Sequence, residues 1–250
     1  MSSNSNATVS MLQAHTSVRK FNQRQFTREE VAELVKTAQC AATSNFRQAY
    51  SLVWIRDEEK RKKVGELACN ALQYETCGAA FVICVDFARL AKACEIHGTE
   101  IMAASAENLL LGCADAAIFA QNLVVAAEAK GLGTCYIGGV RTNIEPIADL
   151  LNLPDLVFPL FGLTIGEPGA ALNAVKPRLP LEAVLFEDSY NTEAIEPVLR
   201  QFDEELNVYY KTRTSNPKDT TWTQDMSAVM CKHMRPHIKG FLAKKGFTFL

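Results

Sequence analysis

Short apolar runs alternate with amphipathic stretches along the chain, which is the pattern of strands separated by helices. The apolar runs predict strands at 51–56, 79–86, 135–137 and 158–166. The 79–86 run is apolar up to its last residue, which is typical of a central strand covered on both faces. Because helices are predicted between these strands, the pattern indicates a single α/β or α+β layered domain.

Helical spacing of apolar positions predicts a helix in each of six further segments. These segments are 9–14, 31–42, 58–69, 143–151, 192–211 and part of 222–245. The 31–42 helix is preceded by Thr27 and Glu30, which have the spacing of a capping box. This local signal fixes where the helix begins.

The longest helical pattern runs from about Thr99 to Lys130 and ends at Gly131, a residue type that commonly ends helices. Residues 109–127 are nearly all apolar and long enough to span a bilayer. However, Asp115 lies near the middle, where a carboxylate costs about 2.5–3.5 kcal/mol in a membrane. The sequence therefore predicts a helix buried on all sides, in a core or a subunit interface, and no membrane partner.

The amino-acid composition is that of a soluble globular protein. The 250 residues are 48% hydrophobic and 22% charged, as in soluble globular proteins. A net charge of -2 gives no reason to expect nucleic acid as a partner. The N-terminal residues lack the features of a signal peptide, so we expect a flexible tail at 1–8 and a cytoplasmic protein. Eight cysteines without a C-x-x-C pair predict reduced thiols, mostly in the core, and no structural zinc.

Paired glycines are the first candidate for chemistry. Gly138 and Gly139 follow the 135–137 strand and precede the 143–151 helix. Such a pair lets a backbone approach a flat ligand or a phosphate, although a plain turn explains the stretch equally well. The chain has no Walker A sequence and no G-x-G-x-x-G sequence, which disfavours a Rossmann dinucleotide site.

Basic residues in polar segments are the second candidate. One group is Arg19, Lys176 and Arg178, and a C-terminal group is Arg213, Lys218 and Arg235. Each cation alone is explained as a solvated surface charge. Together with nearby hydroxyls and the paired glycines, they indicate the walls of an anion site.

Four motifs, in order along the chain, resemble those of one known family. They are His15-Thr16-Ser17-Val18-Arg19, Thr43-Ser44-Asn45-Phe46, Tyr136-Ile137-Gly138-Gly139-Val140-Arg141 and Lys176-Pro177-Arg178-Leu179-Pro180. They resemble the oxygen-insensitive NAD(P)H nitroreductase and FMN-dependent flavin reductase family, of the larger NADPH-preferring type. The resemblance implies a single α+β domain over 1–250 with a nitroreductase-like fold, in which helices flank a central mixed sheet. It also implies a helical excursion at about 190–250 and a homodimer that binds FMN at the subunit interface.

The resemblance further implies which residues bind each ligand. Those carried over to FMN, from its phosphate to its ring, are His15, Thr16, Ser17, Arg19, Thr43, Ser44, Asn45, Tyr136, Ile137, Gly138 and Gly139, with Lys176 and Arg178 at the pyrimidine edge and phosphate. Arg213 and Lys218 match positions for the NADPH 2′-phosphate. Phe46 and Arg235 match positions that border the substrate pocket.

Two positions depart from the family pattern. A family glutamine that precedes the second strand has no clean counterpart here, so either Asn70 or Gln73 supplies that flavin contact, or neither does. Lys218 stands where the family has an arginine, which keeps the charge but loses bidentate phosphate geometry. The preference for NADPH over NADH therefore stays open.

The implied activity is two-electron, ping-pong reduction of nitroaromatics, quinones or flavins by an FMN-dependent NAD(P)H oxidoreductase. Because the hydride chemistry belongs to the cofactor, no catalytic side chain is assigned. Two alternatives stay open. A flavin-binding carrier or regulatory protein would keep the pocket without efficient turnover, and a redox sensor would act through a thiol of low pKa.

Overall fold

The computed structural model describes residues 6–248, in which four strands form one sheet. The strands are β1 (Tyr50–Trp54), β2 (Ala79–Asp86), β3 (Gly133–Ile137) and β4 (Val157–Gly166), in the order β1-β2-β4-β3. Every neighbouring pair is antiparallel. The parallel pairing expected of a mixed sheet is limited, within the described residues, to an isolated bridge between Ser17 and Thr134. The segment at residue 17 is too short and irregular to extend that bridge into a strand.

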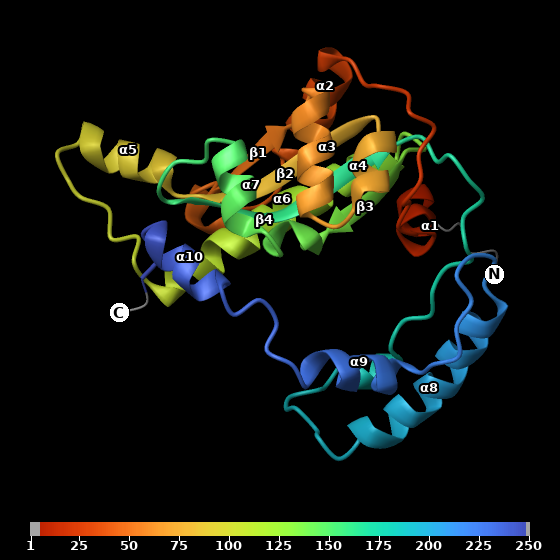
Figure 1. Cartoon of the computed structure of the whole chain (residues 1–250). Coiled ribbons are helices and arrows are strands. Elements are labelled where there is room, and N and C mark those ends of the chain that lie inside the picture. The colour runs from red at the N-terminus through yellow and green to blue at the C-terminus, as the bar shows by residue number, and fades with distance from the viewer. Residues whose placement is uncertain (1–5, 249–250) are drawn as a thin grey trace. The chain divides into compact units, whose positions relative to one another are not determined.

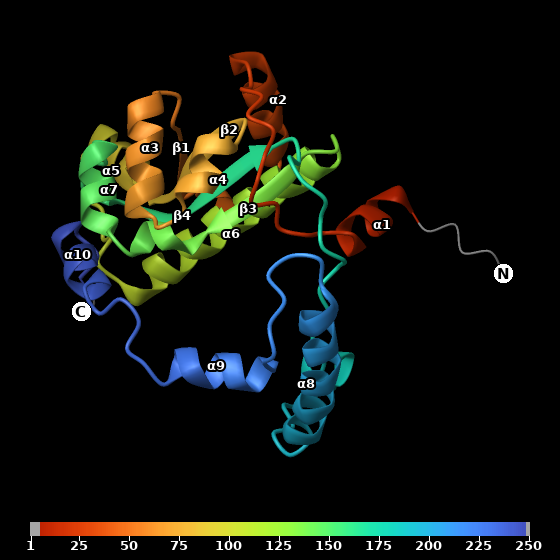
Figure 2. The ribbon, with the colours of Figure 1, turned by 45° about the vertical axis from the view of Figure 1, so that its right-hand side comes forward.

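Helices cover both faces of the sheet (Figures 1 and 2). On one face lies α6 (Ala106–Glu128), against which α2 (Arg28–Ala38) packs. On the opposite face lie α3 (Glu58–Leu67), α4 (Ala71–Thr76) and α7 (Ile144–Leu150). β2 is therefore buried along its whole length, as its uninterrupted apolar run predicted.

The other helices are shorter or lie further along the chain. They are α1 (Ala7–Gln13), α5 (Ala88–Ile96), α8 (Ile195–Thr212), α9 (Trp222–Met230) and α10 (Ile238–Lys244), with single 3₁₀ turns η1 (Ser44–Phe46), η2 (Gly138–Arg141) and η3 (Leu181–Ala183). The predicted tail at 1–8 ends inside α1, and its residues 1–5 lie outside the described part of the chain. The capping box of Thr27 and Glu30 at the start of α2 is confirmed.

Three helix predictions need correction. The long helix begins at Ala106 and not near Thr99, because the Ser105 side chain caps it by accepting the N–H of Asn108. The predicted helix in 222–245 is two helices. Between them Arg235 adopts a left-handed φ of 50°, and the following proline has no N–H to continue a helix. Finally, α4 and α5 were not predicted; α4 has only six residues, and α5 has no buried residue.

The single chain buries one face of α6, and burial of its other face in a subunit interface stays a prediction. One face packs on the sheet and buries Asp115, Phe119 and Leu123. The other face leaves Leu110 68% exposed and Ile118 44% exposed. Among the described helices, α6 alone is long and apolar enough to cross a bilayer, and its buried face with a carboxylate is that of a core helix.

The chain divides into two compact units. The first holds the sheet and comprises the described residues up to Leu12, Ser17–Ala170 and the described residues from Arg235 onward. The second comprises Gln13–Thr16 and Ala171–Met234, with α8 and α9. Its small core is formed by Phe202, Leu206 and Tyr210 on α8, with Leu179, Tyr209 and Trp222 packed around them. The prediction of a single domain stays a prediction.

Candidate functional site

The loop after α2 has an unusual backbone. Asn45, Phe46 and Gln48 have φ values of 46°, 58° and 53°, in the left-handed region that disfavours L side chains. Such residues cost of order 1–3 kcal/mol each and concentrate at ligand sites. Phe46 is also 82% exposed. The strained backbone therefore belongs to the Thr43–Phe46 motif, whose residues the resemblance places beside the flavin and at the substrate pocket.

A buried acid holds the ends of this loop. Asp115 on α6 accepts the Ser44 N–H through Oδ1 at 2.8 Å and the Ala49 N–H through Oδ2 at 3.0 Å. Its side chain is buried. The sequence predicted a buried Asp115 without a role. Its partners were missed because they lie 71 and 66 positions away along the chain, where no local pattern can indicate them.

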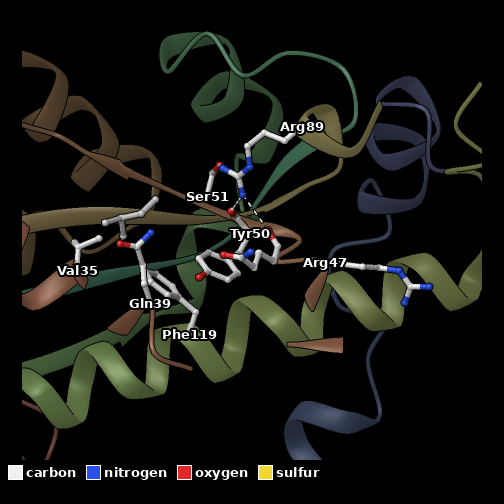
Figure 3. Close-up of a pocket in the computed structure, with 9 residues that line it drawn as sticks. Val35, Gln39, Arg47, Tyr50, Ser51, Arg89 and Phe119 are labelled. Atoms are coloured by element: carbon white, nitrogen blue, oxygen red, sulfur yellow. Dashed lines mark hydrogen bonds between the residues drawn. The ribbon is translucent and has the colours of Figure 1, made fainter. Parts of the chain in front are cut away.

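The base of the same loop adjoins a pocket of about 500 Å³. Figure 3 shows Arg89 above Ser51 and Tyr50 in the wall of this pocket, whereas Arg47 points away from them. The Tyr50 ring stacks on Phe119 of α6, with centroids 4.2 Å apart. The pocket therefore lies between the loop base, β1 and α6.

Thr43, at the start of the loop, has a buried hydroxyl for which the described residues provide no hydrogen-bond partner. A buried hydroxyl without a partner costs roughly 1–3 kcal/mol, and native proteins seldom leave one unsatisfied without a ligand or water. Thr43 is one of the residues carried over to FMN. Its hydroxyl is therefore an unsatisfied polar group on the loop.

The two adjacent glycines have different surroundings. A Cβ added at Gly139 would lie 1.9 Å from the Ala68 carbonyl oxygen and 2.7 Å from Asn70 Nδ2. A Cβ added at Gly138 would meet only the flexible Arg141 side chain, at 3.4 Å. Glycine at 139 is thus required by close packing against the turn after α3, and the open backbone at 138 leaves room for a ligand.

Asn70 and Gln73, the two alternatives for the missing family glutamine, are hydrogen-bonded to each other. Gln73 Nε2 donates to Asn70 Oδ1 at 3.1 Å, and Asn70 Nδ2 donates to the Ala68 carbonyl at 2.6 Å. Since Ala68 packs on Gly139, the structure places this pair beside the glycines. It does not choose between the two side chains.

The segment at 17–19 runs beside β3. Val18 N–H donates to the Thr134 carbonyl at 2.8 Å, next to the bridge of Ser17 with Thr134. Burial raises the pKa of the Cys135 thiol, and the nearby Arg19 guanidinium opposes that rise. Arg19 therefore lies near the strand that leads into Tyr136, Ile137 and the glycines.

Tyr136 keeps its proton at any physiological pH. Burial raises the pKa of its phenol, and its hydroxyl donates to Gln121 Oε1 at 3.3 Å. The residue is still 38% exposed, and its ring meets Phe161 edge to face, with centroids 5.1 Å apart. A neutral, rigid aromatic surface therefore precedes Gly138.

Arg235 lies at the other end of the glycine-bearing segment. Its Nε donates to Thr142 Oγ1 at 3.3 Å. Burial lowers the pKa of the neighbouring Arg141, and the charge of Arg235 lowers it further. The His237 ring nitrogen is 3.1 Å from the Arg141 carbonyl oxygen. The first unit thus brings a predicted pocket residue to the paired glycines.

In the second unit, three cations surround one buried tyrosine. The centroid of the Tyr210 ring is 4.1 Å from Lys218 Nζ, 4.9 Å from Arg213 Cζ and 5.0 Å from Lys176 Nζ. Cations are attracted to the face of an aromatic ring. The structure therefore joins Lys176, which the sequence grouped with Arg19, to the C-terminal basic residues.

Two contacts orient this basic cluster of Lys176, Arg213 and Lys218. Lys218 pairs with Asp225 at 2.5 Å, and this hydrogen bond lowers the pKa of the Asp225 carboxyl. Arg213 Nε donates to the Asn216 carbonyl at 2.7 Å. Arg178, beside the cluster, donates to the Lys176 carbonyl at 2.8 Å. Because His15, Thr16, Lys176 and Arg178 fall in the second unit, they are not placed against the glycines of the first.

The cysteines are free thiols. The prediction that the cysteines lie mostly in the core is wrong. Cys77, Cys84 and Cys135 are buried, Cys94 and Cys113 are partly buried, and Cys40, Cys69 and Cys231 are exposed. Burial raises the pKa of Cys77 to about 12, and every thiol pKa shift among the described residues is upward. A thiolate-based redox sensor gains no support from these thiols.

Comparison with known proteins accounts for these motifs. The sequence profile of the nitroreductase family matches residues 12–167, and that of the nitroreductase family, C-terminal domain, matches residues 176–250. This chain belongs to the nitroreductase family. The family-level resemblance of the four motifs is thereby confirmed.

Relatives match over almost the whole chain. A Cr(VI) reductase of Pseudomonas sp. (strain G-1) is 54% identical over 96% of this chain and 98% of its own length. An NADPH-dependent FMN reductase of Bacillus subtilis (strain 168) is 37% identical over 97% and 99%. The structure of B. megaterium NfrA1 is 38% identical over 97% and 99%, with a TM-score of 0.92. This nitroreductase thus has the predicted fold class, and its membership supports flavin-dependent oxidoreduction with NAD(P)H.

Proposed function

We propose that this nitroreductase binds FMN and uses NADPH to reduce small electron-poor acceptors. The observation that supports the proposal most is the buried Thr43 hydroxyl, which has no partner in the described chain and lies on a strained loop. A polar ligand beside the loop would satisfy that hydroxyl. The residues present therefore fit FMN, which has polar ring edges and a phosphate tail.

The chain supplies different groups to each part of the cofactor. Arg19 would bind the phosphate by charge-assisted hydrogen bonds. Lys176 and Arg178 stay proposed for the pyrimidine edge and phosphate, without a division between them. The loop at Thr43, with either Asn70 or Gln73, would bind polar ring edges, and the open backbone at Gly138 would leave a ring face uncovered. When bound, FMN supplies two-electron hydride chemistry. The protein's part is to hold and orient the flat reactants.

The basic cluster on Tyr210 would bind the NADPH 2′-phosphate through Arg213 and Lys218. NADPH and the acceptor would occupy the same face in turn, in ping-pong order, bordered by Phe46 and Arg235. We propose nitroaromatics, quinones and flavins as acceptors, and chromate as a further one on the strength of the Pseudomonas relative.

A second copy of the chain would cover the outer face of α6. Leu110 and Ile118 are exposed there, and burying such apolar surface favours association. We therefore propose a cytoplasmic homodimer without nucleic-acid or membrane partners.

The purified protein is expected to be yellow and to lose its visible flavin band when NADPH is added under anaerobic conditions. The band should return when an acceptor is added. A colourless protein that takes up no added FMN would contradict the proposal. A yellow protein that stays oxidised in excess NADPH would instead support the carrier alternative.

Thr43→Val is expected to stabilise the FMN-free protein by roughly 1 kcal/mol, because it removes a buried hydroxyl that lacks a partner. The same change should weaken FMN binding about tenfold, the effect of one lost hydrogen bond. Thermal unfolding and FMN titration measure the two effects. Thr37→Val is the control, since the Thr37 hydroxyl is bonded within α2 to Glu33. Unchanged FMN affinity in Thr43→Val would remove the main support for the site.

A further inference from the structure

The loop at 43–49 requires support from outside itself. Its left-handed residues include Phe46, a bulky side chain with no preference for that region. Within the loop, the Arg47 N–H donates to the Ser44 carbonyl at 3.0 Å, and the Phe46 N–H reaches the Thr43 carbonyl only at 3.4 Å. Two such bonds do not define a strained turn. The conformation must therefore be fixed by contacts with the rest of the fold.

The amide groups of the loop are held by a negative charge. Asp115 uses one oxygen for the Ser44 N–H and the other for the Ala49 N–H, so one carboxylate ties both ends of the loop together. It is only 1% exposed. One helical turn further along α6, Phe119 stacks on Tyr50. The same face of α6 therefore anchors the loop and the strand that follows it.

The carbonyl groups of the loop base are held by a positive charge. Arg89 on α5 donates from Nη2 to the Gln48 carbonyl at 2.9 Å and also to the Tyr50 carbonyl. Its Nη1 donates to Ser51 Oγ at 3.0 Å (Figure 3). The buried Asp86 carboxylate lies 3.4 Å from Nη1 and keeps the guanidinium in place. The Asp115 carboxylate thus accepts hydrogen bonds from the N–H groups of the loop, and the Arg89 guanidinium donates hydrogen bonds to its carbonyl groups.

We propose that Asp115 and Arg89 are positioning residues of the flavin site. They hold the loop in the conformation that presents Thr43, Ser44 and Asn45 to the cofactor and Phe46 to the acceptor. This inference rests on the proposed function of that loop. Both residues contact the backbone of residues 44–50, and we assign their role to those contacts.

The first test measures, in the protein without FMN, how firmly Asp115 holds the loop at 43–49. In Asp115→Asn, one oxygen remains, but the new NH₂ group faces a backbone N–H and the charge is lost. Amide hydrogen exchange at Ser44 and Ala49 should accelerate about tenfold or more. Asp57→Ala is the matched control, because Asp57 caps α3 by accepting the Lys60 N–H at 2.8 Å. It should lower stability without changing exchange in the loop. Equal exchange at Ser44 and Ala49 in Asp115→Asn and in the wild type would overturn the proposal.

The second test measures the consequence for the FMN-loaded protein. Asp115→Asn should raise the apparent Kd for FMN about tenfold and lower kcat/KM for the acceptor by a similar factor, while Asp57→Ala changes neither. Arg89→Lys keeps the charge but loses the fork of donors. Because Arg89 lies at the surface, this variant remains informative if Asp115→Asn fails to fold, and it should show the same two changes.

The outcomes separate the inference from the proposed function. If the wild type takes up no FMN, the proposed function fails. The exchange experiment still measures how firmly Asp115 holds the loop. If the wild type binds FMN and turns over, but Asp115→Asn and Arg89→Lys keep wild-type FMN affinity and kcat/KM, the inference fails. A purely structural role would lower the melting temperature and leave both functional constants unchanged.

Discussion

Replacing Gly139 with alanine is expected to lower the free energy of unfolding by about 3 kcal/mol, at the upper end of what overpacking usually costs. The added Cβ would lie 1.9 Å from the Ala68 carbonyl oxygen, well inside contact distance. Ala68 is fully buried, and Cys69 after it already has a φ of 55°. Because the Ala68 carbonyl belongs to the backbone, it cannot move aside as a flexible side chain would.

Gly138→Ala is the matched control for this prediction. Its Cβ would meet only the Arg141 guanidinium, at an ordinary 3.4 Å, so unfolding in urea should change by less than about 0.5 kcal/mol. Under the proposed function it should still reduce FMN affinity, because the methyl group projects into the open space beside the backbone. Similar small losses of stability in both variants would show that the turn at Ala68 yields, and that packing does not require glycine at 139.

Replacing both Arg213 and Lys218 with alanine is expected to raise KM for NADPH about 100-fold. The 2′-phosphate would lose two charge-assisted contacts, each worth roughly 1.5 kcal/mol or more. NADH lacks this phosphate, so its KM should change little. Steady-state kinetics with both nucleotides and one acceptor measure the difference.

Lys211→Ala provides the control, since Lys211 is an exposed cation of α8 that pairs with Asp219 at 3.0 Å. Its removal lowers the net charge without changing the basic cluster, and KM for NADPH should stay near the wild-type value. If the double variant raises KM for NADPH and KM for NADH by the same factor, the basic cluster does not bind the 2′-phosphate. Because cations on Tyr210 also pack the second unit, thermal unfolding must accompany the kinetics.

Some features of the fold followed directly from local sequence. The apolar run of β2 predicted a strand buried on both faces, and Thr27 with Glu30 predicted the start of α2. These signals work because hydrophobic period and capping depend on residues within a few positions of each other. Local sequence did not predict α5, which buries no residue. It also predicted one helix in 222–245, where Arg235 separates two.

The sequence by itself determined the family, the fold class and the residue types of the candidate site, because contiguous motifs such as Thr43–Phe46 carry them. Only the tertiary structure decided what those residues contact. Asp115 meets Ser44 across 71 positions, Gly139 meets Ala68, and Lys176 joins Arg213 on the face of Tyr210. Such pairings depend on how the helices pack against the sheet and against one another, and no periodicity along the chain encodes that packing.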